Sequence, residues 1–170
     1  MPDEQNTTGN VITEQARQWA TEPFEQHETT VSRTDIARYA RAVGETNPVY
    51  YDVEAAKRAG HPDVLAPAYF PYTIRMQAAH LIARSDLEPD GSSSADVPPL
   101  PTNRAMAGET RLEMGALIHA GDKITLNKRI VDLYEKSGRS GALIFVTTEF
   151  VFANQLSEMV MNERFTRIYQ

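Results

Sequence analysis

Apolar residues recur every three or four positions through the first half of the chain, which is the spacing of one face of an α-helix. The pattern predicts short helices over residues 11–19 and 53–60, and a longer one over residues 33–43 that Gly44 ends. The longest helical segment is predicted over residues 68–87. Its apolar face carries Phe70, Ile74, Ala78 and Leu81.

Alternation of apolar and polar residues predicts strands on either side of these helices. The first strand is predicted over residues 27–32. Further along, the alternation changes phase after Ile130, which predicts a β-bulge. The continuous apolar run at residues 143–146 predicts a strand that is buried on both faces. The four later strands are predicted at residues 105–115, 122–136, 140–154 and 157–170.

The order of these elements favours the α+β class. A strand, a group of helices and four antiparallel strands bury both apolar surfaces if one strongly bent sheet wraps around the helix of residues 68–87. Residues 1–10 are polar and are predicted to be disordered, and residues 11–170 are predicted to form a single domain. Residues 88–104 are rich in Pro, Ser and Asp and are predicted to be a long loop that covers a pocket mouth.

Composition and charge narrow the range of functions. The chain has 170 residues, a net charge of −6 and no cysteine, which argues against nucleic acid as a partner and removes cysteine-based metal sites. None of the four histidines has a second ligand at helical spacing, so no metal and no cofactor are expected. The start is not basic and no apolar run is long enough for a membrane helix, so a soluble cytoplasmic protein is expected.

Residues 44–52, with the sequence GETNPVYYD, form a turn that carries side chains suited to chemistry. Glu45 offers a carboxylate and Tyr50 a hydroxyl, although either could simply be a solvated or packed turn residue. Asn47 and Pro48 are better suited to shaping the turn than to touching a substrate. The turn contains no histidine, and His61 is the one candidate for a substitute base, with a surface or capping role as the alternative.

Four motifs cover most of the chain in a characteristic order: RYARAVGETNPVYYD, LAPAYFP before the long helix, HAGDKI at the start of a strand, and EKSGRSGALIFVTTE. In order and spacing they resemble the MaoC-like dehydratases, and within these the N-terminal-type domains of fungal and mycobacterial fatty-acid-synthase dehydratase-like proteins. The resemblance covers roughly residues 11–170. It implies the hot-dog fold, in which a bent antiparallel sheet wraps around one long helix.

Catalytic members of this family hydrate a trans-2-enoyl thioester or catalyse the reverse dehydration. Their turn has the form Gly-Asp-x-Asn-Pro-x-His, and its aspartate and histidine activate one water. The resemblance places Glu45 where the aspartate would be and Tyr50 where the histidine would be. A phenol with an ordinary pKa of about 10 is a poor base at neutral pH.

The family also binds the thioester carbonyl through a backbone N–H at the start of the long helix, where an oxyanion develops. The resemblance places Ala66, Pro67 and Ala68 there, in place of the usual glycine. It therefore implies a substrate-binding role for these three residues together with Asn47 and Pro48.

A turn with tyrosine in place of histidine resembles the non-catalytic subunit of heteromeric dehydratases such as the mycobacterial hydroxyacyl dehydratases. The resemblance implies that this chain shapes the acyl pocket in a homodimer, or in a heterodimer with a catalytic MaoC-like subunit that supplies the Asp/His dyad. The substrate would be a thioester of coenzyme A or of acyl carrier protein. Two alternatives remain open: a self-sufficient enoyl-CoA hydratase that uses Glu45 with His61 or Tyr50, and a non-enzymatic acyl-thioester binding protein.

Overall fold

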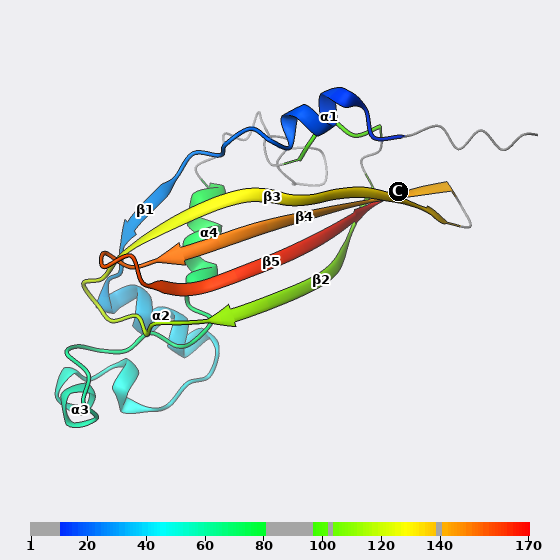
Figure 1. Cartoon of the computed structure of the whole chain (residues 1–170). Coiled ribbons are helices and arrows are strands. Elements are labelled where there is room, and N and C mark those ends of the chain that lie inside the picture. The colour runs from blue at the N-terminus through cyan, green and yellow to red at the C-terminus, as the bar shows by residue number, and fades with distance from the viewer. Residues whose placement is uncertain (1–10, 81–96, 102–103, 139–140) are drawn as a thin grey trace, which may run out of the picture.

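The computed structural model describes residues 11–80, 97–101, 104–138 and 141–170. Within these residues, five strands form one antiparallel sheet in the order β1-β3-β4-β5-β2 (Figure 1). The predicted α+β class with an antiparallel sheet around a helix is confirmed, because α4 lies against one face of the curved sheet. The elements are α1 (Glu14–Trp19), β1 (His27–Thr30), α2 (Arg33–Ala42), the 3₁₀ helix η1 (Pro48–Tyr50), α3 (Val53–Arg58), α4 (Pro71–His80), β2 (Ala105–Met114), β3 (Lys123–Gly138), β4 (Gly141–Ala153) and β5 (Met159–Tyr169).

Local signals in the sequence fix both ends of α2. The Ser32 hydroxyl accepts a hydrogen bond from the Asp35 N–H at 3.0 Å and so caps the first turn. At the other end Gly44 adopts a φ of +78°, which a residue with a side chain rarely takes. The N–H of Glu45 then bonds to the Ala40 carbonyl at 2.8 Å and closes the helix.

The helix that packs on the sheet begins later than the sequence indicated. Residues 68–70 form a turn in which the Phe70 N–H bonds to the Pro67 carbonyl at 2.9 Å. Helix α4 itself starts at Pro71, the position where proline's missing N–H costs nothing. Residues 81–87 of the predicted helix, and residues 88–96 and 102–103 of the predicted loop, lie outside the described residues.

Two of the three register shifts in the sheet lie among residues of its outer face, which is the face turned away from α4. The register of β3 against β4 shifts between Ile130 and Asp132, which confirms the predicted bulge. A second shift, between Ala107 and Thr110 in β2, was not predicted. The expectation that β4 is buried on both faces is wrong. Ile144 and Val146 are buried, but Phe145 between them is only half-buried, because no helix of the described residues covers the outer face.

The core lies between α4 and the inner face of the sheet. Phe70 and Ile74 of α4 pack in one buried cluster with Phe150, Phe152 and Met161 of the sheet. Burying large side chains of this kind stabilises a fold by about 1.5–3 kcal/mol each. A second cluster under α1 joins Ile12 and Ala16 to Ile144, Val146 and Tyr169.

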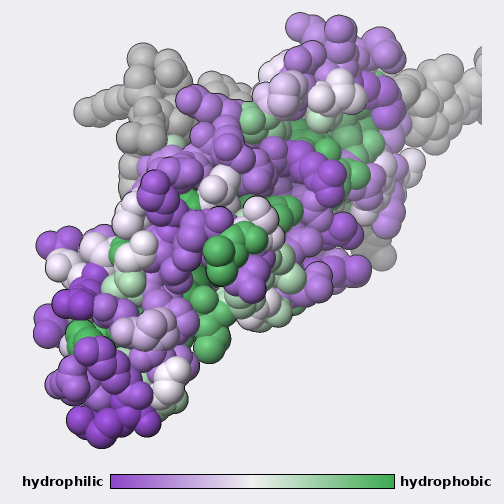
Figure 2. Space-filling model, turned by 60° about the vertical axis from the view of Figure 1, so that its left-hand side comes forward, coloured by the Kyte–Doolittle hydropathy of each residue, from purple (hydrophilic) through white to green (hydrophobic). Residues whose placement is uncertain are grey.

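The surface is uneven in polarity. The lobe that carries α3, at the bottom of Figure 2, is largely hydrophilic, whereas hydrophobic side chains reach the surface in the middle of this view. All ten residues of β2 are exposed, and β2 is an edge strand of the sheet. Among the described residues, no helix is long and apolar enough to cross a membrane.

Candidate functional site

The turn of residues 44–52 is held together by its own polar groups. The Asn47 carboxamide oxygen accepts a hydrogen bond from the Val49 N–H at 3.1 Å and caps η1. The Asp52 carboxylate accepts from the Ala55 N–H at 2.7 Å and caps α3. Asn47 thus shapes the turn by capping η1, and this role requires no contact with a substrate.

Glu45 and Tyr50 are close enough to affect each other electrostatically. The pKa of Tyr50 is raised above its ordinary value, first by burial and then by the negative charge of Glu45. Its phenol therefore stays protonated at neutral pH. The neighbouring Tyr51 hydroxyl donates a 2.6 Å hydrogen bond to the Glu45 backbone carbonyl. The Glu45 side chain remains exposed. The turn thus presents a solvated carboxylate beside a phenol that stays protonated at neutral pH and so does not act as a base there.

The segment before α4 connects this turn to the sheet. The Leu65 N–H bonds to the Val49 carbonyl at 3.0 Å, and Leu65 forms an isolated antiparallel bridge with His119. The next residue, Ala66, donates to the Ile118 carbonyl at 2.8 Å. Residues 64–66 therefore run between the candidate turn and the β2–β3 connection, which places the predicted substrate-binding segment beside the turn.

Two N–H groups in the turn that precedes α4, those of Ala68 and Tyr69, are candidates for binding a ligand. Ala66 and Pro67 are buried, but Ala68 is exposed. Neither the Ala68 N–H nor the Tyr69 N–H has a hydrogen-bond acceptor among the described residues. Adjacent free N–H groups at a helix start are suited to bind the carbonyl oxygen of a thioester.

His61 is paired with another histidine. Its Nδ1 lies 3.2 Å from Nε2 of His119, a contact between residues that sequence reasoning did not connect. The His119 N–H donates to Oδ2 of Asp122 at 2.8 Å, which orients the β2–β3 connection. The pKa of His119 is lowered by burial, an effect that the neighbouring carboxylate of Asp122 partly opposes. The proposed part of His61 as a substitute base stays a prediction.

A buried polar cluster lies between α4 and the inner face of the sheet, which sequence reasoning also missed. Arg75 of α4 forms an ion pair with Glu163 of β5 at 2.8 Å, and the Tyr69 hydroxyl donates to the same Glu163 oxygen at 3.2 Å. The pKa of Tyr69 is raised to about 12 by burial and by the charge of Glu163. The other Glu163 oxygen is buried and has no partner among the described residues. The Arg75 guanidinium also lies 4.0 Å from the centre of the Phe150 ring.

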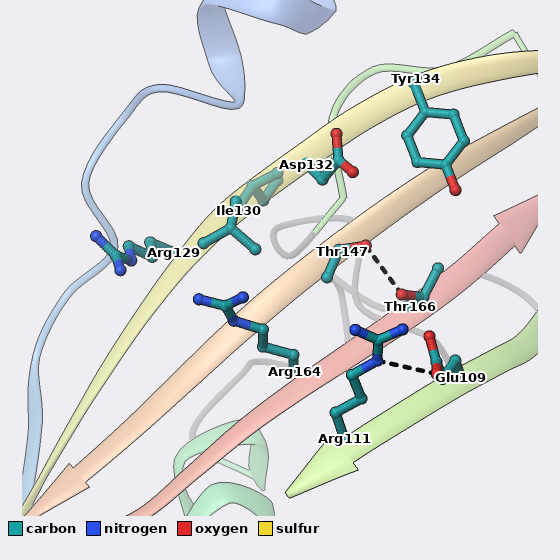
Figure 3. Close-up of a pocket in the computed structure, with 10 residues that line it drawn as sticks. Glu109, Arg111, Arg129, Ile130, Asp132, Tyr134, Thr147, Arg164 and Thr166 are labelled. Atoms are coloured by element: carbon teal, nitrogen blue, oxygen red, sulfur yellow. Dashed lines mark hydrogen bonds and ion pairs between the residues drawn. The ribbon is translucent and has the colours of Figure 1, made fainter. Parts of the chain in front are cut away.

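The outer face of the sheet carries a separate depression of about 640 Å³ (Figure 3). Along β4 and β5, the residues that line the depression alternate with the core residues that pack under α4. Successive side chains of a strand point to opposite faces, so the depression lies on the face of the sheet away from Ala68 and Tyr69. The depression is polar. It is lined by Glu109, Arg111, Arg129, Ile130, Val131, Asp132, Tyr134, Thr147, Arg164 and Thr166. Among the described residues, no group of three or more acidic or histidine side chains is placed to hold a metal ion.

Comparison with known proteins identifies the family. The model of the FAS1-like dehydratase domain region matches residues 18–163. The chain belongs to this FAS1-like dehydratase domain family. A UPF0336 protein of Streptomyces coelicolor is 34% identical over 118 residues, which is 69% of each chain. A UPF0336 protein of Thermobifida fusca is 31% identical over 141 residues, 82% of this chain and 80% of its own.

Solved structures of low sequence identity share the fold of this FAS1-like dehydratase domain. The ChsH1–ChsH2 complex of Mycobacterium tuberculosis superposes with a TM-score of 0.66 at 20% identity, over 92% of this chain and 94% of the other. The HadBC complex of the same organism, a (3R)-hydroxyacyl-ACP dehydratase, gives a TM-score of 0.59 at 19% identity, over 86% and 92% of the two chains. A MaoC-like dehydratase from Rhodospirillum rubrum gives 0.60 at 17% identity, over 87% and 90%. These likenesses confirm the predicted fold and the resemblance to the MaoC-like dehydratases.

Proposed function

We propose that this chain is the pocket-shaping subunit of a heteromeric enoyl-thioester hydratase or 3-hydroxyacyl-thioester dehydratase. A related hot-dog chain would supply the aspartate and histidine that activate water. The observation that carries the proposal is the chemistry of the turn. Where a base is needed, the chain has Tyr50, and its environment raises the pKa of the phenol instead of producing a base that is active at neutral pH.

The surface next to α4 supports a partner of the same fold. Leu112 and Met114 of the edge strand pair in register with buried Glu163 and Met161, so they face the side of the sheet that α4 covers. Both side chains are nevertheless about half exposed, at 47% and 48%. An open strand edge bordered by exposed apolar side chains favours pairing with another chain.

The exposed residues of α4 add to this surface. Tyr72 and Met76 are one helical turn apart and are 37% and 36% exposed. A second hot-dog chain that pairs with β2 would cover both the strand edge and this flank of the helix. HadBC and ChsH1–ChsH2 are complexes of different subunits, which supports a heteromeric arrangement.

The deciding experiment is co-expression with a hot-dog chain that carries the full Gly-Asp-x-Asn-Pro-x-His turn, followed by an enoyl-CoA hydration assay over a range of acyl lengths. This chain alone is expected to give only background hydration. The complex is expected to be active, and replacing the partner's histidine by alanine should reduce kcat by a factor on the order of a hundred or more.

Variants of this chain test the same proposal. Tyr50→Phe in the complex should change the rate little, because it removes a hydroxyl that takes no part in the reaction. Tyr51→Phe is the matched control, since it removes the neighbouring hydroxyl that donates to the Glu45 carbonyl. A large loss of rate in Tyr50→Phe alone would contradict the proposal.

A self-sufficient hydratase is the second candidate, favoured by the exposed carboxylate of Glu45 beside Tyr50 and by the two free N–H groups at the start of α4. In that case the purified chain turns over enoyl-CoA without a partner. Glu45→Gln would abolish this activity, because a neutral amide accepts no proton. Turnover by the lone chain that Glu45→Gln removes would therefore replace the heteromeric proposal.

A further inference from the structure

The depression on the outer face of the sheet consists of two neighbouring rows of side chains that differ in charge (Figure 3). The basic row crosses β3, β4, β5 and β2 in register and contains Arg129, Glu149, Arg164 and Arg111. The acidic row crosses the same strands and contains Asp132, Thr147, Thr166 and, in the bulge of β2, Glu109. The two rows are two residues apart along β2, β4 and β5, which corresponds to roughly 7 Å, and three residues apart along β3 because of its bulge.

The basic row is built around a buried carboxylate. Glu149 is only 1% exposed, although it lies on the outer face. It accepts hydrogen bonds from Nε of Arg129 at 2.6 Å and from Nε of Arg164 at 2.9 Å. These bonds hold both guanidinium groups by one edge and fix their positions on the face. The side chains of Arg129 and Arg164 remain 68% and 54% exposed.

Two charged residues of these rows, Arg111 and Asp132, are less well satisfied within one chain than Arg129 and Arg164. Arg111 stands directly opposite Arg164 in the register of β2 and β5, and like charges in that arrangement destabilise a sheet. Arg111 bonds to Glu109, but this exposed pair contributes little. At the acidic row, Asp132 is exposed and has no hydrogen bond or ion pair within the part of the chain that the structure describes.

The depression as a whole carries no net charge. Its three arginines are balanced by Glu109, Asp132 and Glu149, so it exerts no long-range attraction on a free anion. What remains is a pattern with one basic side and one acidic side. Such a pattern is complementary to itself when two copies meet face to face.

We propose that the outer face binds the outer face of a second copy of this chain across a twofold axis. The axis lies midway between the two facing sheets. It runs across the strands, parallel to the two rows and between them. It places the basic row of each copy over the acidic row of the other. Arg129 then faces Asp132 of the second copy, and Arg111 faces Glu109 of the second copy. A contact of this kind uses the same patch on both chains, as twofold assemblies do.

This interface is independent of the one expected at β2 and α4, because it uses the other face of the sheet. A heterodimer formed through β2 and α4 would therefore associate back to back with another heterodimer and give four chains. Arg111 and Glu109 belong to β2 itself, whereas Arg129 and Asp132 lie on β3, away from that edge, so a change at Asp132 tests the outer face while the β2 contact stays intact.

Sedimentation velocity over a range of concentrations tests the proposal on the full chain, alone and with its partner. Asp132→Arg sets an arginine opposite Arg129 of the second copy at two symmetry-related places. It is expected to weaken association by about tenfold or more and to remove one association step. Raising the salt concentration should weaken the wild-type assembly in the same direction.

A charge exchange provides the decisive control. Arg111→Glu and Glu109→Arg each place like charges together and should weaken association, whereas the double variant exchanges the two charges and should restore it. Glu113→Arg is the matched control, since it changes an exposed glutamate of the same strand outside the two rows and should have no effect. A wild-type chain that shows no association step sensitive to Asp132→Arg, or a double variant that stays dissociated, would overturn the proposal.

Discussion

Replacing Arg75 by methionine is expected to destabilise the fold far more than the loss of a surface charge would. Arg75 and Glu163 join α4 to the centre of the sheet, with side chains only 16% and 2% exposed. Without the guanidinium, the Glu163 carboxylate stays buried with one remaining donor, the Tyr69 hydroxyl at 3.2 Å. A buried charge that loses its partner cannot recover its hydration without disrupting the packing around it.

The size of the effect follows from that burial. Removing one partner of a buried ion pair costs about 3–5 kcal/mol. Small domains have only about 5–15 kcal/mol of stability in total, so Arg75→Met should remove a large part of it. For a chain of this length the change corresponds to a fall in Tm of roughly 6–20 °C. Methionine retains the apolar contact with the Phe150 ring, so the loss reflects mainly the charge.

Urea unfolding followed by far-UV circular dichroism measures the free energy of unfolding for each variant. Glu163→Leu should cost a similar amount, because it leaves Arg75 without its carboxylate. The double variant Arg75→Met with Glu163→Leu should return close to the wild-type stability, since it leaves no charge unpaired. Arg33→Met is the matched control. It removes an arginine from the exposed pair with Asp63 and should change stability little.

Losses below about 1 kcal/mol in both single variants, the value expected of exposed pairs, would show that burial does not strengthen this ion pair. Losses of the two single variants that add up in the double variant would contradict the prediction as well. Additive losses would mean that the two side chains contribute separately and do not form one buried unit.

Two further predictions concern other parts of the chain. The pKa of His119 is lowered in the folded state, so the unfolded chain binds a proton there more readily. Stability should therefore fall as the pH drops below 6.5. His119→Gln should reduce this pH dependence, which thermal unfolding on both sides of that pH measures. Gly115→Ala should destabilise the fold by more than the roughly 1–2 kcal/mol of left-handed strain expected for Gly60→Ala. A Cβ at Gly115 would lie 2.0 Å from the Met159 carbonyl oxygen, whereas one at Gly60 would have no described atom within 4 Å. Chemical unfolding of the two variants compares them, and equal losses would contradict the clash.

The sequence predicted features that depend on neighbouring residues. The end of α2 follows from Gly44, and the bulge of β3 follows from the change of phase after Ile130. Both are local, because a φ of +78° and an extra residue in a strand leave their mark within a few positions. The start of α4 was predicted three residues early, because residues 68–70 have the composition of a helix but form a turn.

Contacts between distant segments were not predictable in the same way. His61 and His119 are 58 positions apart and meet where the segment around Leu65 pairs with the β2–β3 connection. The bulge of β2 had one signal, Gly108, where a Cβ would lie 2.9 Å from the Thr166 carbonyl oxygen. Glu163 also had a signal, since it alternates with Met161 and Phe165 on the apolar side of its strand. A charge in that position indicates a buried ion pair, but nothing in the pattern identifies Arg75 as its partner.

The open edge at β2 also bears on how much of the chain persists in the cell. Within the described part of the chain, the ten exposed residues of β2 have no neighbouring strand on one side, so their backbone groups can pair with any extended polypeptide, including another copy that is still folding. If the proposed partner is what covers this edge, chains made in excess of the partner would be lost to aggregation or to proteases. The abundance of the chain would then follow the supply of its partner, and matched synthesis of the two subunits would matter more for it than its own rate of translation.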